Sequence, residues 1–347
     1  MNAQKPVVTG WRCAACGTRV AISDVFSWRC PNSSDTDRHH VLEIENVIAP
    51  LRSNGDSNPF IGFQRYLAWD AFAATLGLEF DSRTKIIRDL DDAVAKVAGT
   101  GFRTSPFLRN DALSDALGFA EQGGIWIKDE THNVAGSQKA RHLFTQLLHL
   151  IAVENVGRAP WQNQSERPQL AIASCGNAAI AASTLARAVD WPIQVFVPEH
   201  ADAPTLKILS ALNANVVRCA RLATDPPGDP CVFRFREAIE QGCVPFGVQG
   251  PENAWCLDGG RTIGFEMAVV AEEISGSLIS RMFVQAGGGA FVACAASGFF
   301  AGATKPKIHA VQTDGCAPLV RAFEIANTTG GARNAGSRWS QCMWPWE

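Results

Sequence analysis

Short apolar runs alternate with longer amphipathic segments through the second half of the chain. Residues 170–173 and 193–197 are apolar runs of strand length, and the segments that follow them space their apolar residues as helices do. Another apolar run at residues 282–285 is again followed by a helical pattern. Because strands that alternate with helices form parallel sheets covered by helices, the pattern predicts an α/β fold.

The same patterns predict the individual elements. Predicted helices cover residues 60–76, 113–119, 141–153, 178–189, 205–214, 233–241, 262–274 and 291–302. Predicted strands cover residues 125–127, 170–173, 193–197, 215–218, 282–285 and 307–312.

The predicted elements fall into three parts. Residues 1–48 form a separate ribbon-like segment, and the polar residues 49–58 form a linker. We expect a large domain from residues 58–139 together with 249–347, and a smaller α/β domain from residues 140–248. Two domains suit a chain of 347 residues with 46% hydrophobic residues, which can bury a large core.

Charge and hydropathy exclude two classes of partner. The net charge is −3, whereas proteins that bind nucleic acids present a basic surface, so we expect no nucleic-acid partner. Residues 282–304 carry no charged side chain and are long enough to cross a bilayer. The glycines at 287–289 would break a spanning helix, however, so we expect no membrane segment.

The cysteines indicate a reducing compartment and a metal site. Eleven cysteines at irregular spacing, with no signal-peptide pattern in residues 1–11, favour reduced thiols in the cytoplasm. Cys13 and Cys16 form a Cys-x-x-Cys pair, and Cys30 begins a second pair that lacks its other cysteine. His39, or its neighbour His40, would complete a tetrahedral zinc site. The alternative is a degenerate ribbon with free cysteines.

Lys139 is the main candidate for covalent chemistry. It follows an apolar run and a polar loop that ends in Gly136 and Ser137, which places it in the first turn of a helix. The positive end of the helix dipole disfavours an ammonium ion, and a lysine with a lowered pKa is a nucleophile toward aldehydes. The alternative is an exposed helix lysine. His142 is expected to be a solvated residue of the same helix.

Two turns between a strand and a helix predict anion-binding sites. Residues 174–178 (Ser-Cys-Gly-Asn-Ala) follow an apolar run, and backbone N–H groups at such a helix start can bind a carboxylate or a phosphate. Asn177 adds a side-chain donor. The second turn consists of Gly287, Gly288 and Gly289 and is followed by Ala290. Because the three glycines have no Cβ, their backbone N–H groups can converge on a phosphate.

Lys139 and these two turns together resemble the pyridoxal-phosphate enzymes of fold type II, the tryptophan-synthase-like group. They are most similar to the threonine synthases and threonine-synthase-like proteins, which have the three features in the same order. Lesser likenesses lie at residues 104–107, 258–262 and 311–318. The resemblance covers residues 58–347. It implies a two-domain α/β protein with parallel sheets flanked by helices, a pyridoxal 5′-phosphate cofactor, an amino-acid substrate and a homodimer.

The resemblance also implies a role for each candidate residue. Lys139 would form a Schiff base with the cofactor and carry the proton of the substrate Cα. Asn177 would bind the 3′-oxygen of the cofactor. The residues implied for the substrate carboxylate are Ser174, Gly176 and Ala178. Those implied for the cofactor phosphate are Gly287, Gly288, Gly289 and Ala290.

The chain departs from the family beside the lysine and near its end. Gln138 stands where the family has an aromatic residue, and Ala140 where it has an acidic one. In the family, the residue that faces the pyridine nitrogen lies in a C-terminal segment. Here the sequence ends at residues 342–347, so no such residue can be assigned, and we expect a truncated chain.

Three hypotheses for the function therefore stay open. The first is a threonine-synthase-like lyase that eliminates or replaces a group at Cβ or Cγ of an activated amino acid. The second is a serine/threonine dehydratase or a β-replacement synthase of the same fold. The third is a truncated, inactive paralogue that acts as a binding protein. Dinucleotide binding is disfavoured because no Gly-x-Gly-x-x-Gly motif opens either strand–helix unit.

Overall fold

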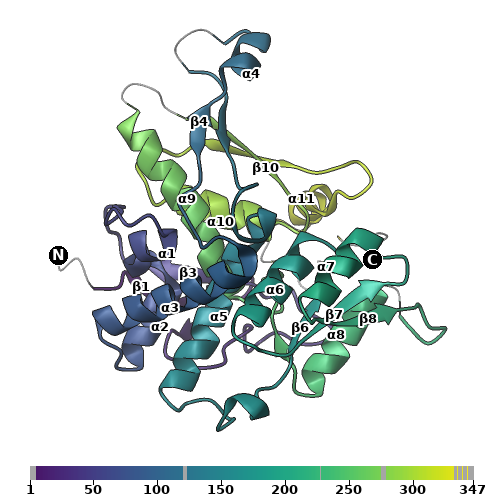
Figure 1. Cartoon of the computed structure of the whole chain (residues 1–347). Coiled ribbons are helices and arrows are strands. Elements are labelled where there is room, and N and C mark those ends of the chain that lie inside the picture. Colours follow the sequence, from purple (N-terminus) through teal and green to yellow (C-terminus); the bar gives the residue numbers. More distant parts are fainter. Residues whose placement is uncertain are drawn as a thin grey trace.

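The computed structural model describes residues 5–119, 123–226, 228–274 and 279–331, together with Asn334, Arg338 and Cys342. Long helices cross the middle of the molecule, and a sheet with its own helices lies beside them (Figure 1). Residues 343–347, at the end of the C-terminal stretch discussed above, lie outside the described part of the chain.

A four-stranded parallel sheet forms the centre of the region between residues 170 and 245, with the strand order β8-β7-β6-β9. Helices connect the consecutive strands, so that each strand returns in the same direction, and this confirms the predicted α/β class. The strands are β6 (Leu170–Ala173), β7 (Ile193–Pro198), β8 (Asn215–Cys219) and β9 (Val244–Pro245). The connecting helices are α6 (Asn177–Ala188), α7 (Ala203–Ala211) and α8 (Pro230–Glu240).

Two further strand pairs lie at the top of the molecule in Figure 1. β10 (Arg281–Gln285) and β11 (Lys307–Val311) are parallel, and α11 (Pro318–Thr328) follows them. β4 (Phe107–Arg109) and β5 (Trp126–Lys128) are antiparallel, a pairing that the sequence pattern did not predict. The N–H of Asn110 donates to the carbonyl of Ile125 at 2.8 Å, so the two strands continue as a hairpin around α4 (Asp111–Ala116).

At the centre of the molecule one helix packs against two others, since α9 (Cys256–Glu273) contacts both α5 (Lys139–Asn155) and α10 (Ala290–Phe299). Glycines on α9 set how closely the backbones approach. A Cβ at Gly259 would lie 1.9 Å from the carbonyl oxygen of Arg141 on α5. A Cβ at Gly264 would lie 2.3 Å from the carbonyl oxygen of Ala295 on α10.

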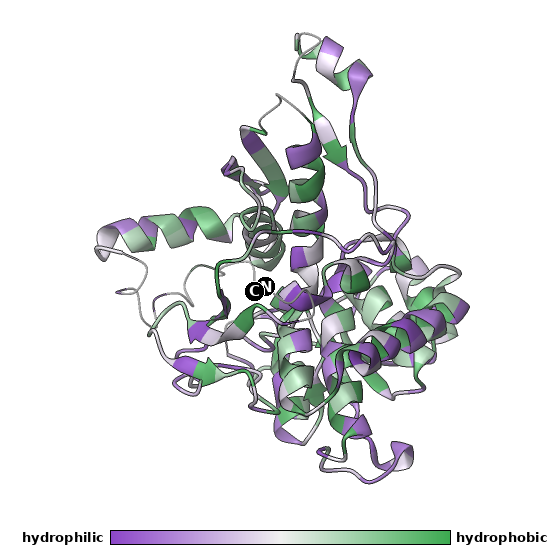
Figure 2. Cartoon of the chain, turned by 90° about the vertical axis from the view of Figure 1, so that its left-hand side faces the viewer, coloured by the Kyte–Doolittle hydropathy of each residue, from purple (hydrophilic) through white to green (hydrophobic). Residues whose placement is uncertain are grey.

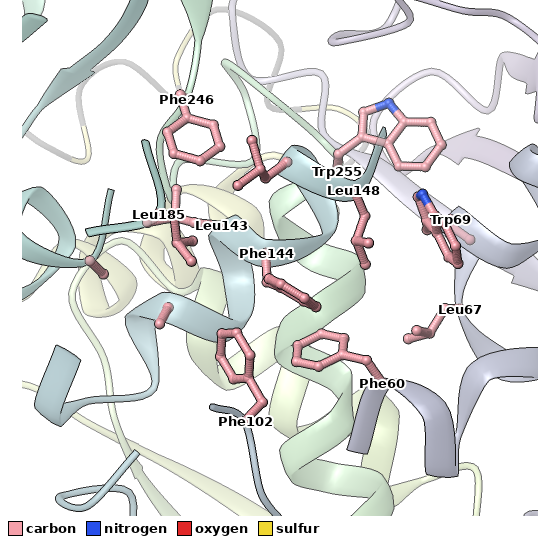
Figure 3. Packing of buried hydrophobic residues seen from close by; sticks show 14 of the residues in the cluster. Phe60, Leu67, Trp69, Phe102, Leu143, Phe144, Leu148, Leu185, Phe246 and Trp255 are labelled. Carbon is pink, nitrogen blue, oxygen red and sulfur yellow. The ribbon is translucent and has the colours of Figure 1, made fainter. Parts of the chain in front are cut away.

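Aromatic side chains fill the space between α5 and the N-terminal helices. The rings of Phe60, Phe102 and Phe144 meet with centroids 4.5 to 5.0 Å apart (Figure 3). All three side chains are fully buried. Burying a phenylalanine contributes about 1.5–3 kcal/mol, so this cluster fixes one end of α5 firmly in the core.

The N-terminal helices differ from the prediction. The single helix expected at residues 60–76 is divided into α1 (Pro59–Gly62), the 3-10 turn η1 (Gln64–Tyr66) and α2 (Ala68–Thr75). Leu67 has an extended backbone (φ −86°, ψ 139°), and the carboxylate of Asp258 accepts hydrogen bonds from the N–H groups of Ala68 and Trp69. This distant cap starts a new helix. The 19-residue helix α3 (Phe80–Ala98) was not predicted.

The N-terminal segment forms a three-stranded antiparallel sheet in the order β2-β1-β3. Its strands are β1 (Val8–Cys13), β2 (Arg19–Ala21) and β3 (Leu42–Asn46). Trp11 is fully buried and meets Trp255 of the central region edge to face, with ring centroids 5.1 Å apart. The segment therefore packs on the rest of the chain and shares its core.

Hydropathy along the helices follows their packing. Many helices carry hydrophilic residues on one side and hydrophobic residues on the other (Figure 2). The uncharged stretch at residues 282–304 divides into β10, a glycine turn and α10. None of the helices in the described part of the chain has the length and apolarity needed to cross a membrane.

Candidate active site

Lys139 is the first residue of α5, as the sequence predicts. The chain reaches it through the 3-10 turn η2 (Val134–Gly136), where Ala135 (φ 56°) and Gly136 (φ 69°) adopt left-handed backbone conformations. The side chain of Asn133 accepts from the N–H of Val134 at 2.8 Å and so begins this turn. The loop before the lysine therefore has a fixed conformation.

The amine of Lys139 lies in a partly buried position against α9 and α10. Burial lowers the pKa of the Lys139 ammonium and outweighs the opposite, smaller effect of Cys256 on α9 and Cys294 on α10. Burial also raises the pKa of Cys256 to about 12, so this thiol stays neutral at ordinary pH. A lysine that loses its proton more easily presents a neutral amine, which is the nucleophilic form.

His142 lies one turn further along α5 and is buried, so the expectation of a solvated histidine is wrong. Its Nδ1 lies 2.8 Å from the carbonyl oxygen of Cys256, while Nε2 has no hydrogen-bond partner among the described residues. Burial, followed by the charge of Lys139, lowers the pKa of His142 to about 4. His142 is buried because its face of α5 packs closely against α9.

A buried ionic network joins the lysine loop to α9. Arg141 donates from Nε and Nη2 to the two carboxylate oxygens of Glu130, both at 2.9 Å, and from Nη1 to Glu266 at 2.5 Å. Lys128 also pairs with Glu266. Two cationic and two anionic side chains thus balance one another, and charge-assisted bidentate bonds hold their geometry.

This network was not predicted as a unit. Burial acts to raise the pKa of Glu130, but Arg141 and the hydroxyl of Ser105 outweigh burial and hold that pKa below its usual value. Glu130 also accepts from Asn133 at 2.6 Å and so fixes the loop that leads to Lys139. The sequence shows Glu130 before Lys139 and Arg141 two residues after it, but only the fold shows that these two side chains form a pair.

The predicted carboxylate loop lies at the start of α6. The N–H of Ser174 donates to the carbonyl of Phe196 at 3.1 Å, which holds the loop on the end of β7. Asn177 is exposed, Ala178 is buried, and no described residue accepts a hydrogen bond from the N–H groups of Gly176, Asn177 or Ala178. The helix that begins at this loop, α6, packs against η2, the turn before Lys139.

The predicted phosphate turn lies between β10 and α10. A Cβ added at Gly287 or Gly288 would meet no atom within 4 Å, and Gly289 has a left-handed backbone (φ 100°). Within the described residues, nothing accepts a hydrogen bond from the N–H groups of these three glycines. Open space and free N–H groups at the start of the ten-residue helix α10 are what a phosphate group needs.

Gln312 holds this turn in place and was not assigned a role from the sequence. Its Nε2 donates to the carbonyl of Gly287 at 2.7 Å, and its Oε1 accepts from the N–H of Leu319 at 2.9 Å. The side chain therefore links the glycine turn to the start of α11. Only the likeness at residues 311–318 pointed to this segment.

These observations fit pyridoxal phosphate. A phosphate would find unpaired N–H groups at Gly287, Gly288 and Gly289, and an aldehyde would find the amine of Lys139, which faces Cys294 one turn into the same helix α10. Most of the C-terminal segment in which the sequence analysis sought a partner for the pyridine nitrogen lies outside the described residues. Asp258, which belongs to the likeness at residues 258–262, caps α2.

The N-terminal cysteines lie together. The ligand atoms of Cys13, Cys16, Cys30 and His40 are all within 4.8 Å of one another. The histidine of this group is His40, the neighbour that was considered beside His39, whereas His39 is under the influence of the charges of Asp37, Arg236 and Glu252.

Comparison with known proteins places the chain in a family. The family model of pyridoxal-phosphate dependent enzymes matches residues 98–340. Among solved structures, a pyridoxal 5′-phosphate-dependent aspartate racemase gives a TM-score of 0.51 at 16% identity, covering 71% of this chain and 66% of that one. Maize serine racemase gives a TM-score of 0.50 at 16% identity, covering 71% of this chain and 64% of that one.

These likenesses show the fold alone, because the sequence identities are low, and the chain spans less than two thirds of the length of the maize protein. A search of the curated proteins found no match. The family model, in contrast, covers well over half of the chain and includes Lys139 and both anion-binding turns. The chain therefore belongs to the pyridoxal-phosphate-dependent enzyme family, as the resemblance of its motifs indicated.

Proposed function

We propose that the protein is a pyridoxal-phosphate-dependent lyase that acts on a small amino acid, with Lys139 as the cofactor-binding and proton-transferring residue. The observation that carries this proposal is the position of the Lys139 amine. It is partly buried, burial lowers the pKa of its ammonium, and the neighbouring thiols of Cys256 and Cys294 are kept neutral by their own burial. An amine in this state can form a covalent bond with an aldehyde and later accept a proton.

The two helix starts support the binding roles. The N–H groups of Gly287, Gly288 and Gly289 would hold the cofactor phosphate, with Ala290 beginning the helix whose dipole favours an anion there. The N–H groups around Gly176 and Ala178, with the hydroxyl of Ser174, would hold the substrate carboxylate. Asn177, exposed at the same helix start, would donate to the 3′-oxygen of the cofactor.

The chain supplies orientation and proton transfer, while the bound cofactor would supply an electron sink for the carbanion at the substrate Cα. The Lys139 amine would remove the α-proton and return it. His142 would keep the surroundings of the amine uncharged, because its own pKa is lowered to about 4. The Arg141–Glu130 pair would hold the loop before Lys139 in place during the proton transfer.

Within this chemistry we propose a threonine-synthase-like elimination or replacement at Cβ or Cγ of an activated amino acid, supported by the order of the three motifs. The second candidate is a serine/threonine dehydratase or β-replacement reaction. Supplying O-phosphohomoserine, serine and threonine separately distinguishes them. Release of phosphate from O-phosphohomoserine supports the first reaction, whereas ammonia and oxo acid from serine or threonine support the second.

A third candidate, an inactive binding protein, makes a different prediction. Such a protein would show no absorbance band of lysine-bound cofactor even with added pyridoxal phosphate, and none of the three amino acids would react. The homodimer remains a proposal that light scattering after size-exclusion chromatography tests. The cytoplasm remains the proposed location, supported by the free state of all eleven cysteines.

A further inference from the structure

We propose that Cys13, Cys16, Cys30 and His40 bind one zinc ion in a closed, structural site. The four ligand atoms lie within 4.8 Å of one another although they come from three separate stretches of the chain. Three thiols and one imidazole are a ligand set that zinc prefers, and four protein ligands leave no position open for substrate. None of the four ligands belongs to the proposed cofactor site around Lys139.

The distances agree with tetrahedral coordination. The sulfur atoms of Cys16 and Cys30 lie 3.7 Å apart, and the sulfur of Cys13 lies 3.5 Å from Nδ1 of His40. With Zn–S of about 2.3 Å and Zn–N of about 2.0 Å, tetrahedral angles separate two sulfurs by about 3.8 Å and a sulfur from a nitrogen by about 3.5 Å. A zinc ion therefore fits between these atoms with little movement of the side chains.

The surroundings of His40 are those of a metal ligand. Its other ring nitrogen, Nε2, lies 3.3 Å from a carboxylate oxygen of Asp37. In zinc sites the ligand histidine usually donates this second N–H to a carboxylate, which fixes the tautomer and turns the free nitrogen toward the metal. Asp37 thus leaves Nδ1 unprotonated and directed at the thiols.

The backbone of the Cys-x-x-Cys turn is also shaped for a metal. The N–H of Cys16 points to the sulfur of Cys13 at 3.5 Å, and Gly17 has a left-handed backbone (φ 77°) that lets the chain turn back. The side chain of Asn32 donates toward the sulfur of Cys16 at 3.5 Å. These donors would stabilise thiolate ligands, whose negative charge exceeds that of the ion they bind.

The segment that this metal would hold packs on the helices of the active site. The carbonyl of Val25 lies 2.6 Å from Nε2 of His149 on α5, and the carbonyl of Trp28 accepts from the N–H of Ala254 at 2.8 Å, just before α9. Zinc at the four ligands would therefore fix a segment that supports both the lysine helix and the helix that carries Cys256.

The test measures zinc in the full chain, purified under reducing conditions, by elemental analysis. Wild type and His39→Ala should each hold close to one zinc ion per chain, whereas Cys30→Ser and His40→Ala should lose it. His39→Ala is the matched control because it removes the neighbouring imidazole. His40→Cys should keep the metal, and Asp37→Asn should weaken zinc affinity by about 10- to 100-fold.

Reconstitution with cobalt(II) gives a second readout, which uses the wild type and His40→Cys and therefore does not depend on the folding of the variants that lose zinc. The wild type should show thiolate-to-cobalt absorption, and His40→Cys should intensify it by adding a sulfur ligand. A wild-type chain that holds neither zinc nor cobalt would overturn the proposal, as would equal metal loss in His39→Ala and His40→Ala. Because these readouts need no pyridoxal phosphate, their failure is distinct from failure of the proposed enzyme function.

Discussion

The imidazole of His142 donates a hydrogen bond from Nδ1 to the carbonyl oxygen of Cys256, at a distance of 2.8 Å. The carbonyl can only accept, so Nδ1 carries a proton, and because burial lowers the pKa of His142 to about 4, Nε2 is unprotonated at ordinary pH. A neutral imidazole results, one helical turn from Lys139. A charged imidazole would repel the Lys139 ammonium, and burial lowers the pKa of both groups.

Stability is expected to decrease as the pH falls below about 6.5. Burial lowers the pKa of His142 to about 4 and that of His149 to about 3. Between these values and the ordinary pKa, the unfolded chain binds protons that the folded chain does not, so the free energy of unfolding rises with pH. Burial raises the pKa of Asp258 to about 6, which offsets one of the two histidines. We expect a net loss of about 1.4 kcal/mol per pH unit from about pH 6 to about pH 4.

Urea denaturation at several pH values between about 4 and 7 measures this slope. His149→Phe should flatten it, because one of the two histidines that resist protonation in the folded state is removed. A free energy of unfolding that stays constant, or rises, as the pH falls through this range would contradict the assignment of neutral buried histidines.

Gly287→Ala should weaken cofactor binding without unfolding the protein. A Cβ at Gly287 meets no atom within 4 Å, so the free energy of unfolding should change by less than about 0.5 kcal/mol. The methyl group would occupy the space proposed for the phosphate, and losing one charge-assisted hydrogen bond would reduce pyridoxal-phosphate affinity about tenfold or more.

Gly264→Ala is the contrasting variant for this prediction. Its Cβ would lie 2.3 Å from the carbonyl oxygen of Ala295, so it should destabilise the fold by at least about 1–3 kcal/mol. Cofactor titrations and denaturation curves of the two variants separate binding from packing. Unchanged cofactor affinity in Gly287→Ala would remove the phosphate role from this turn.

Arg141→Met should destabilise the protein strongly, by about 3–5 kcal/mol, because it leaves the buried carboxylates of Glu130 and Glu266 short of a partner. Arg88→Met is the control, since Arg88 pairs with Asp56 at the surface and should contribute less than about 1 kcal/mol. Chemical denaturation of both variants gives the comparison. Equal effects would show that the network has no special role in holding the lysine loop.

Gln312→Ala should loosen the glycine turn, because it removes the donor to Gly287 and the acceptor for Leu319. With about 1 kcal/mol for each neutral hydrogen bond, we expect cofactor affinity to fall about tenfold. Gln241→Ala, at the exposed end of α8, serves as the control. If the two variants bind pyridoxal phosphate equally well, Gln312 does not shape the phosphate site.

The sequence predicted best where each element depends on its own residues. β6 and the lysine at the start of α5 appear where apolar periodicity and turn residues indicated. The break at Leu67 could not be predicted, because the cap that starts α2 comes from Asp258, far along the chain. The long helix α3 was missed although its charged and apolar residues alternate as in an amphipathic helix.

The motifs of the candidate site could be recognised in the sequence, but the residues that surround them could not. Lys139, Asn177 and the glycine turn stand in recognisable local patterns. The buried surroundings of His142 and the pairing of Arg141 with Glu130 and Glu266 arise from helix packing, which a single sequence does not reveal. Likewise, only the fold shows that His40, and not His39, lies with the three cysteines.

The most direct test of the account is reduction of the protein with borohydride after incubation with pyridoxal phosphate, followed by peptide mapping. We expect the pyridoxyl group on Lys139, and no label at any other lysine. Lys139→Met, which keeps a side chain of similar length without the amine, should remain folded and unlabelled. A wild-type chain that carries no label, or carries it on another lysine, would contradict the central claim that Lys139 binds the cofactor.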